Sequence, residues 1–83
     1  MKNLLEGKIV LITGASRGIG KAIAKAMAAE GASIAFTHTS MNGALETEKE
    51  LAEMGVKVKR YQSDASNYDE AVKVVNDVVA TWG

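Results

Sequence analysis

Three glycines stand between an apolar run and a segment of helical spacing, and this arrangement constrains the fold more than any other feature of the chain. The apolar run is residues 9–12 (IVLI), the glycine stretch is residues 13–20 (TGASRGIG), and the helical segment extends to residue 30. A strand that ends in a glycine turn and leads into a helix presents backbone N–H groups and the positive end of the helix dipole. The sequence therefore predicts an anion-binding loop, and a dinucleotide pyrophosphate is the ligand that this architecture accepts.

Each glycine of this loop has a separate task. Gly14 allows the tight turn, Gly18 leaves the backbone bare where a phosphate approaches, and Gly20 lets the helix pack close to the strand. The pattern Gly-x-x-x-Gly-x-Gly lacks the Gly-Lys-Ser/Thr ending of a P-loop. The alternative is a glycine turn that binds nothing, and three glycines in register with the flanking elements disfavour it.

The remaining chain alternates strands with helices. Strands are predicted at residues 8–13, 33–37 and 56–62, and helices at residues 18–30, 44–54 and from Ser66 onward, with Asp69 completing a capping box for the last helix. Gly31 and Gly55 stand where left-handed helix caps belong. This order predicts an α/β fold, the N-terminal half (βαβαβα) of a Rossmann-type doubly wound parallel sheet with strand order 3-2-1.

Apolar stripes predict the buried faces of two helices, and charged residues predict the exposed ones. The first helix is expected to bury Ile19, Ile23, Ala26 and Met27, and the third to bury Val72, Val75, Val79 and Trp82. Lys21 and Lys25 are expected to face away, and Glu46, Glu50 and Glu53 to form a solvated face of the second helix.

The first strand is almost wholly apolar, as a strand buried on both faces is, whereas the third alternates lysines with valines as an edge strand does. A central first strand needs a neighbour on each side. We therefore expect residues 1–83 to be the N-terminal part of a single larger nucleotide-binding domain whose catalytic half is absent from this chain.

Composition excludes several classes of function. Ten basic and ten acidic side chains cancel, which argues against a nucleic-acid or membrane-surface partner. The chain has no cysteine for a disulfide or a thiolate metal site, and no run approaches the ~20 apolar residues of a membrane span. We expect a cytoplasmic protein without a metal site, a nucleic-acid partner or a membrane contact.

The loop resembles that of the short-chain dehydrogenase/reductase family. The pattern Thr-Gly-x-x-x-Gly-x-Gly at residues 13–20, the lead-in at residues 5–8 (LEGK) and Asp64 after the third strand all match that family, in particular the N-terminal part of bacterial 3-oxoacyl-acyl-carrier-protein reductases. The resemblance implies an oxidoreductase, commonly a homotetramer, that reduces an acyl-carrier-protein-linked or other carbonyl substrate in fatty acid biosynthesis. The cofactor-binding residues expected from the loop and the resemblance are Gly14, Ala15, Ser16, Arg17, Gly18, Ile19, Gly20, Thr39, Ser40, Asp64 and Ala65.

The expected cofactor is NADP(H). A Rossmann domain that selects NAD places Asp or Glu roughly 20 residues beyond the glycines to bind the ribose 2′-hydroxyl. Here no acid occurs between residues 30 and 46, and His38 stands near that place without an evident orienting partner for catalysis. Arg17 supplies a planar cation suited to a 2′-phosphate, assisted by the hydroxyls of Ser16, Thr39 and Ser40. The resemblance implies that Asp64 hydrogen-bonds the adenine amino group and that Ala65 lies beside the ring.

The catalytic residues of the family have no counterpart in this chain. The family's Tyr-x-x-x-Lys pair needs a lysine four residues after a tyrosine. Ala65 stands four residues after Tyr61, and Lys73 stands five residues after Tyr68. On a helix, one extra position turns a side chain by about 100°. An Asn-Asn-Ala-Gly segment is also missing. We therefore expect this chain to hold one end of the cofactor without chemistry of its own. A non-catalytic NADP(H)-binding module and an inert fragment are the alternatives.

Overall fold

The computed structural model describes residues 5–15, 18–39, 41, 43–63 and 67–82. Its elements are, in order, β1 (Ile9–Thr13), α1 (Gly18–Ala29), β2 (Ser33–His38), α2 (Ala44–Glu53), β3 (Val58–Gln62) and α3 (Tyr68–Trp82). The predicted alternation of strands and helices is confirmed. The predicted bounds are furthest off at the starts of β3 and α3, which begin at Val58 and Tyr68 rather than at residues 56 and 66.

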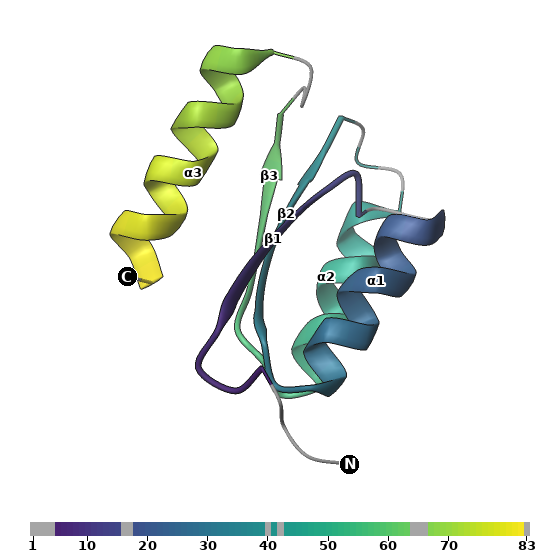
Figure 1. Cartoon of the computed structure of the whole chain (residues 1–83). Coiled ribbons are helices and arrows are strands. Elements are labelled where there is room, and N and C mark those ends of the chain that lie inside the picture. The colour runs from purple at the N-terminus through teal and green to yellow at the C-terminus, as the bar shows by residue number, and fades with distance from the viewer. Residues whose placement is uncertain (1–4, 16–17, 40, 42, 64–66, 83) are drawn as a thin grey trace.

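The three strands form one parallel sheet in which β2 lies between β1 and β3 (Figure 1). The predicted order 3-2-1 and the edge position of β3 are confirmed. Thr13 pairs with Thr37, and His38 pairs with Gln62, near the carboxyl ends of the strands. All three strands therefore end at the same edge of the sheet, which we call the carboxyl edge.

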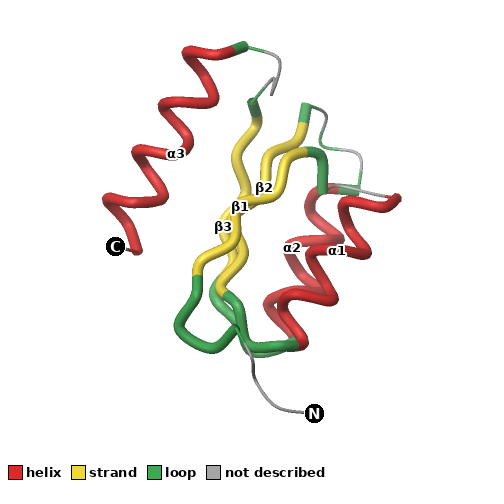
Figure 2. The backbone as a smooth tube through the Cα atoms, in the orientation of Figure 1, coloured by secondary structure: helices red, strands yellow, loops and turns green. Residues whose placement is uncertain are grey.

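Helices cover both faces of the sheet, α1 and α2 on one side and α3 on the other (Figures 1 and 2). The larger core lies under α1 and α2, where Ile34, Phe36 and Leu51 are fully buried. The smaller core joins Ala35 of β2 to Val74 and Val78 of α3. Because it has a strand on each side and a helix on each face, β2 is buried along almost its whole length.

The buried face of α1 differs from the prediction. Ala24 and Ala28 are buried, whereas Ile19 and Ile23 are 80% and 43% exposed. Of the predicted stripe, Met27 alone packs against the core, and Ala26 is exposed. The physical reason is that α1 lies close to the sheet, where only small side chains fit between the helix and the strands.

The buried face of α3 also differs from the prediction. Val74 and Val78 are buried, and Trp82 is the one residue of the predicted stripe that packs with them. The helix contains two overlapping apolar stripes at helical spacing, and the sequence pattern does not choose between them. The other stripe is exposed and consists of Val72, Val75 and Val79.

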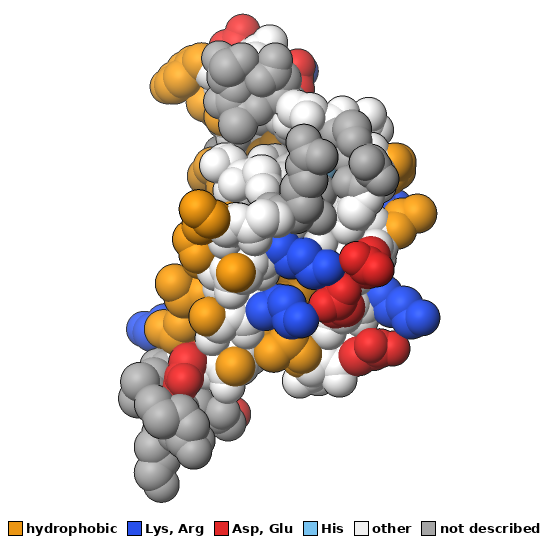
Figure 3. All heavy atoms as spheres, turned by 90° about the vertical axis from the view of Figure 1, so that its right-hand side faces the viewer, with side chains coloured by type: hydrophobic (Ala, Val, Ile, Leu, Met, Phe, Trp, Pro, Cys, Tyr) orange, Lys and Arg blue, Asp and Glu red, His pale blue; other side chains and the backbone are white. Residues whose placement is uncertain are grey.

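The lysines of α1 differ from the prediction that they face away from the rest of the protein. Both reach α2. Lys21 Nζ lies 3.1 Å from Glu46 Oε1 and 2.8 Å from Glu50 Oε2, and Lys25 Nζ lies 2.9 Å from Glu50 Oε1. Figure 3 shows lysine and glutamate side chains gathered on this face of the molecule beside hydrophobic ones. The bonds from Lys21 and Lys25 lower the pKa of Glu50 to about 2.

The edge strand β3 is tied to α3 by polar contacts as well. The Tyr61 hydroxyl donates a hydrogen bond to Asp77 Oδ2 at 2.6 Å, and Lys59 Nζ lies 2.9 Å from the same oxygen. At its N-terminus, α3 is capped by Asn67, whose Oδ1 accepts a hydrogen bond from the Glu70 N–H. The predicted start at Ser66 with a capping box to Asp69 is wrong, because α3 begins at Tyr68 and Asn67 is its cap. Ser66 itself lies outside the described residues.

Candidate dinucleotide-binding site

The glycine loop leaves β1 at the carboxyl edge and leads directly into α1. Gly14 and Gly18 have φ values of 71° and 65°, which glycine adopts without steric cost. The N–H groups of Gly14 and Ala15 both donate to the carbonyl oxygen of Thr37, at 3.0 and 3.3 Å. The first half of the loop is therefore fixed to the end of β2, and Ala15 is buried there.

Gly20 is the point where α1 touches the loop. A Cβ on Gly20 would overlap the carbonyl oxygen of Gly14 and would lie 3.0 Å from its carbon and 3.1 Å from Ala15 Cα. All three atoms belong to the backbone, so no side chain can rotate away. The predicted reason for this glycine, close packing of the helix, is confirmed.

The described residues leave the N-terminus of α1 open at Gly18, where a phosphate would approach. A Cβ on Gly18 would meet nothing within 4 Å, and Ile19 beside it is 80% exposed. The first N–H groups of a helix lack partners within the helix, and the first turn of α1 carries no acid to compete for them. The described part of the loop thus fits a dinucleotide pyrophosphate.

The structure places Thr39, an expected contact of the cofactor, exposed at the carboxyl edge directly after β2. Gly14, Ala15 and Thr39 are brought together at this edge by the parallel pairing of β1 with β2. Five other expected contacts lie outside the described residues, so their roles stay predictions: Ser16, Arg17, Ser40, Asp64 and Ala65.

A cavity of about 270 Å³ opens at the carboxyl ends of β2 and β3. Thr39, Gln62, Ser63 and Glu70 line it. Ser63 is 7% exposed, and its Oγ donates a hydrogen bond to Glu70 Oε1 at 3.2 Å. Residue spacing does not indicate this pair, because the contact depends on the direction in which α3 leaves the sheet.

His38 lies below the edge rather than on it. Its side chain is 1% exposed, and its ring centroid is 6.1 Å from that of Phe36. It therefore belongs to the layer between the sheet and the helices α1 and α2.

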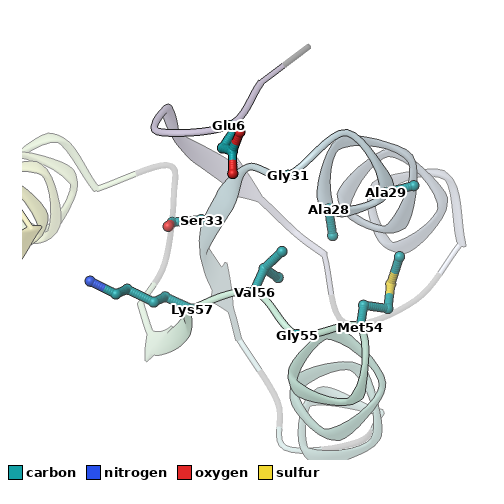
Figure 4. A pocket seen from close by; sticks show the side chains of 9 residues that line it. All are labelled: Glu6, Ala28, Ala29, Gly31, Ser33, Met54, Gly55, Val56 and Lys57. Atoms are coloured by element: carbon teal, nitrogen blue, oxygen red, sulfur yellow. The ribbon is translucent and has the colours of Figure 1, made fainter. Parts of the chain in front are cut away.

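A second, larger hollow of about 360 Å³ lies at the opposite edge of the sheet, where α1 and α2 end. Glu6, Ala29 and Met54 border it from three different segments (Figure 4). In open α/β sheets ligands bind outside the carboxyl ends of the strands, and helix C-termini present carbonyl groups rather than N–H groups. This hollow therefore does not suit a phosphate.

The electrostatic surroundings of the turn after β2 suit an anion. Among the described residues of this turn, Thr39, Met41 and Gly43, none is acidic. The first acid of α2, Glu46, is bound to Lys21. In the described part of the chain, no group of three or more His, Asp or Glu side chains could hold a metal ion, and no helix is long and apolar enough to cross a membrane.

The parallel sheet, the glycine loop and the open helix N-terminus define a Rossmann-type dinucleotide-binding unit. Residues 8–83 match the model of the short chain dehydrogenase family. The chain belongs to this family and has its Rossmann-type fold.

Curated relatives differ in their substrates. The chain is 42% identical over 73 residues to the 3-oxoacyl-[acyl-carrier-protein] reductase FabG of Vibrio harveyi, with 88% of this chain and 30% of that protein covered. It is 42% identical over 83 residues to the NADP-dependent mannitol dehydrogenase of Alternaria alternata, with 95% of this chain and 31% of that protein covered. The chain thus spans about three tenths of the length of these relatives.

Solved structures agree on the fold and differ in cofactor. A short chain dehydrogenase of Burkholderia cenocepacia in complex with NADP has a TM-score of 0.91 and 36% identity, covering 96% of this chain and 33% of that one. A short chain dehydrogenase of Mycobacterium paratuberculosis bound to NAD has a TM-score of 0.91 and 33% identity, covering 96% of this chain and 34% of that one. One of these neighbours holds NADP and the other holds NAD.

Proposed function

We propose that this chain is the cofactor-binding part of an NADPH-dependent short-chain reductase that reduces 3-oxoacyl-acyl-carrier-protein to the 3-hydroxyacyl form in fatty acid biosynthesis. The catalytic residues belong to a further part of the same domain, which supplies the neighbour of β1. The proposed enzyme is cytoplasmic and a homotetramer, as the resemblance to its family implies.

The geometry of the glycine loop carries the proposal. The proposed phosphate cradle at the N-terminus of α1 is supported by the backbone contact at Gly20 and the open backbone at Gly18. The absence of acids from the described part of the turn after β2 supports NADPH over NADH, because a carboxylate there would repel a 2′-phosphate. In the proposed complex, Arg17 pairs with that phosphate, and Thr39 contributes its hydroxyl.

A second substrate class, polyols and their ketones, is favoured by the mannitol dehydrogenase relative. The same cofactor half serves different substrates, because the substrate is bound elsewhere in such domains.

The proposal is tested on the purified full-length protein that carries this sequence. Fluorescence titration with NADPH and NADH measures the two dissociation constants, and turnover is measured with an acetoacetyl thioester of acyl carrier protein and with mannitol plus NADP. We expect NADPH to bind at least about tenfold more tightly than NADH, the value of one charge-assisted contact. Reduction of the thioester should exceed oxidation of mannitol.

Arg17→Ala should remove most of the preference for NADPH and leave NADH binding unchanged. Lys25→Ala is the matched control, because this cation of α1 is occupied by Glu50. Equal binding of NADPH and NADH by the parent protein would refute the cofactor assignment. Turnover of mannitol alone would replace the proposed substrate with the second class.

A further inference from the structure

Gly14 is the residue at which the glycine loop turns, and its backbone needs to be held from outside. Its φ of 71° is open to glycine, but a glycine adopts many other conformations as readily. A loop that binds a ligand in one conformation therefore requires contacts that select it. Thr37 at the end of β2, which pairs with Thr13 at the end of β1, supplies such contacts.

Thr37 holds the peptide groups on both sides of Gly14. Its Oγ1 accepts a hydrogen bond from the Gly14 N–H at 3.3 Å. Its carbonyl oxygen accepts hydrogen bonds from the Gly14 N–H at 3.0 Å and from the Ala15 N–H at 3.3 Å. Since Thr37 is only 4% exposed, water competes little for these bonds. One buried residue thus fixes the peptide group before Gly14 and the one after it.

The second of these peptide groups also meets α1. It joins Gly14 to Ala15, and its carbonyl oxygen lies so close to Gly20 that a Cβ there would overlap it. A rotation of this peptide group would therefore drive the oxygen against the helix or withdraw it from the helix. The orientation that Thr37 selects is in this way transmitted to the N-terminus of α1, where the proposed pyrophosphate binds.

We propose that the Thr37 hydroxyl is a positioning group for the loop: it holds the Gly14 backbone in the conformation that binds a pyrophosphate and does not touch the cofactor itself. This inference rests on the proposed function, since it assumes a dinucleotide in the loop. It adds a residue inside β2 to the contacts expected from the loops. Residue spacing does not indicate it, because the contact joins two different strands.

The experiment replaces Thr37 in the full-length protein with valine, which keeps the β-branched shape and suits a strand but accepts no hydrogen bond. Without the hydroxyl, the loop should occupy its binding conformation for a smaller fraction of the time, and the apparent affinity falls by that fraction. We expect binding to weaken about threefold, near the lower end for one neutral hydrogen bond, because the Gly14 N–H keeps the carbonyl oxygen of residue 37. NADPH and NADH should weaken by the same factor, since both carry the pyrophosphate.

Steady-state turnover of NADPH separates positioning from a loss of folded protein. Positioning predicts a higher KM for NADPH at unchanged kcat, because the pyrophosphate is bound equally in the ground state and the transition state. A smaller folded fraction would lower the apparent kcat and leave KM unchanged. Thr37→Ser is the matched control, since it keeps the hydroxyl and should bind both dinucleotides as the parent does. Thr37→Ala, a second variant without the hydroxyl, should repeat the effect of Thr37→Val.

The outcomes distinguish this inference from the proposed function. A Thr37→Val or Thr37→Ala protein that binds NADPH and NADH as tightly as the parent overturns the inference and leaves the proposed function intact. A loss of affinity confined to NADPH, or an equal loss in Thr37→Ser, overturns it as well. A parent protein that binds neither NADPH nor NADH overturns the proposed function together with the inference.

Discussion

Replacing Gly20 with alanine tests the closest contact in the structure. The added methyl group would overlap the Gly14 carbonyl oxygen and would lie 3.1 Å or less from two further backbone atoms. Since those atoms cannot rotate away, α1 must shift from the loop or the loop must open. Either movement disturbs the phosphate cradle as well as the packing.

The size of the effect follows from two opposing contributions. Overpacking costs ~1–3 kcal/mol, and contact with three backbone atoms places Gly20→Ala near the upper value. Alanine is better than glycine inside a helix by ~1 kcal/mol. The net loss in the free energy of unfolding should therefore be about 2 kcal/mol.

The measurement is denaturant-induced unfolding of the full-length protein, with NADPH titration on the same samples. Ala26→Gly is the matched control, because Ala26 is an exposed residue of the same helix. Removing a methyl group there should cost ~1 kcal/mol through helix propensity alone and leave NADPH binding unchanged. Adding a methyl group at Gly20 should destabilise the protein, although propensity predicts the reverse.

The sign of the change in the free energy of unfolding caused by Gly20→Ala tests whether α1 contacts the loop. If Gly20→Ala were more stable than the parent by the ~1 kcal/mol of helix propensity, then α1 would not touch the loop as described. The geometric basis of the proposed phosphate cradle would then fail with it.

Two further predictions concern charged contacts. Because Lys21 and Lys25 lower the pKa of Glu50 from 4.5 to about 2, their contribution to stability should be complete above pH 4.5 and lost as the pH falls through about 2. Lys21→Met should remove most of that pH dependence, and unfolding curves that keep the parent's profile between these values would contradict the pairing. The hydrogen bond from the Tyr61 hydroxyl is the main cause that lowers the pKa of Asp77 below its ordinary value of 3.8. Tyr61→Phe removes this bond and should therefore raise the pKa of Asp77 toward 3.8. Carboxyl NMR titration checks this, and an unchanged pKa would show that the 2.6 Å bond is not formed in solution.

The order of elements could be predicted because each boundary has a local chemical cause. Gly31 and Gly55 end their helices with φ values of 95° and 87°, which few other residues adopt without strain. The tasks of Gly14 and Gly20 were predictable for the same reason, since a sharp turn and a close approach each demand a missing side chain. Local sequence is enough for such positions.

The faces of the helices could not be predicted, because they depend on how close each helix lies to the sheet. α1 approaches so closely at Gly20 that it buries Ala24 and Ala28 and leaves Ile19 outside. Pairs that cross between elements were missed for a related reason. The spacing rules that join residues within one helix do not indicate that Lys21 reaches Glu50 or that Ser63 reaches Glu70.

The open side of β1 has a consequence for how the protein is made. In the described part of the chain β1 has one neighbouring strand, β2, and Ile9 is 38% exposed. Such an edge is a template for pairing with other chains. Translation proceeds at ~5–20 residues per second, so this part of the proposed domain is exposed on the ribosome before its partner strand arrives. In the proposed domain, the later strand would protect this edge when it pairs with β1, and substitutions that delay its docking should lower soluble yield before they lower cofactor affinity.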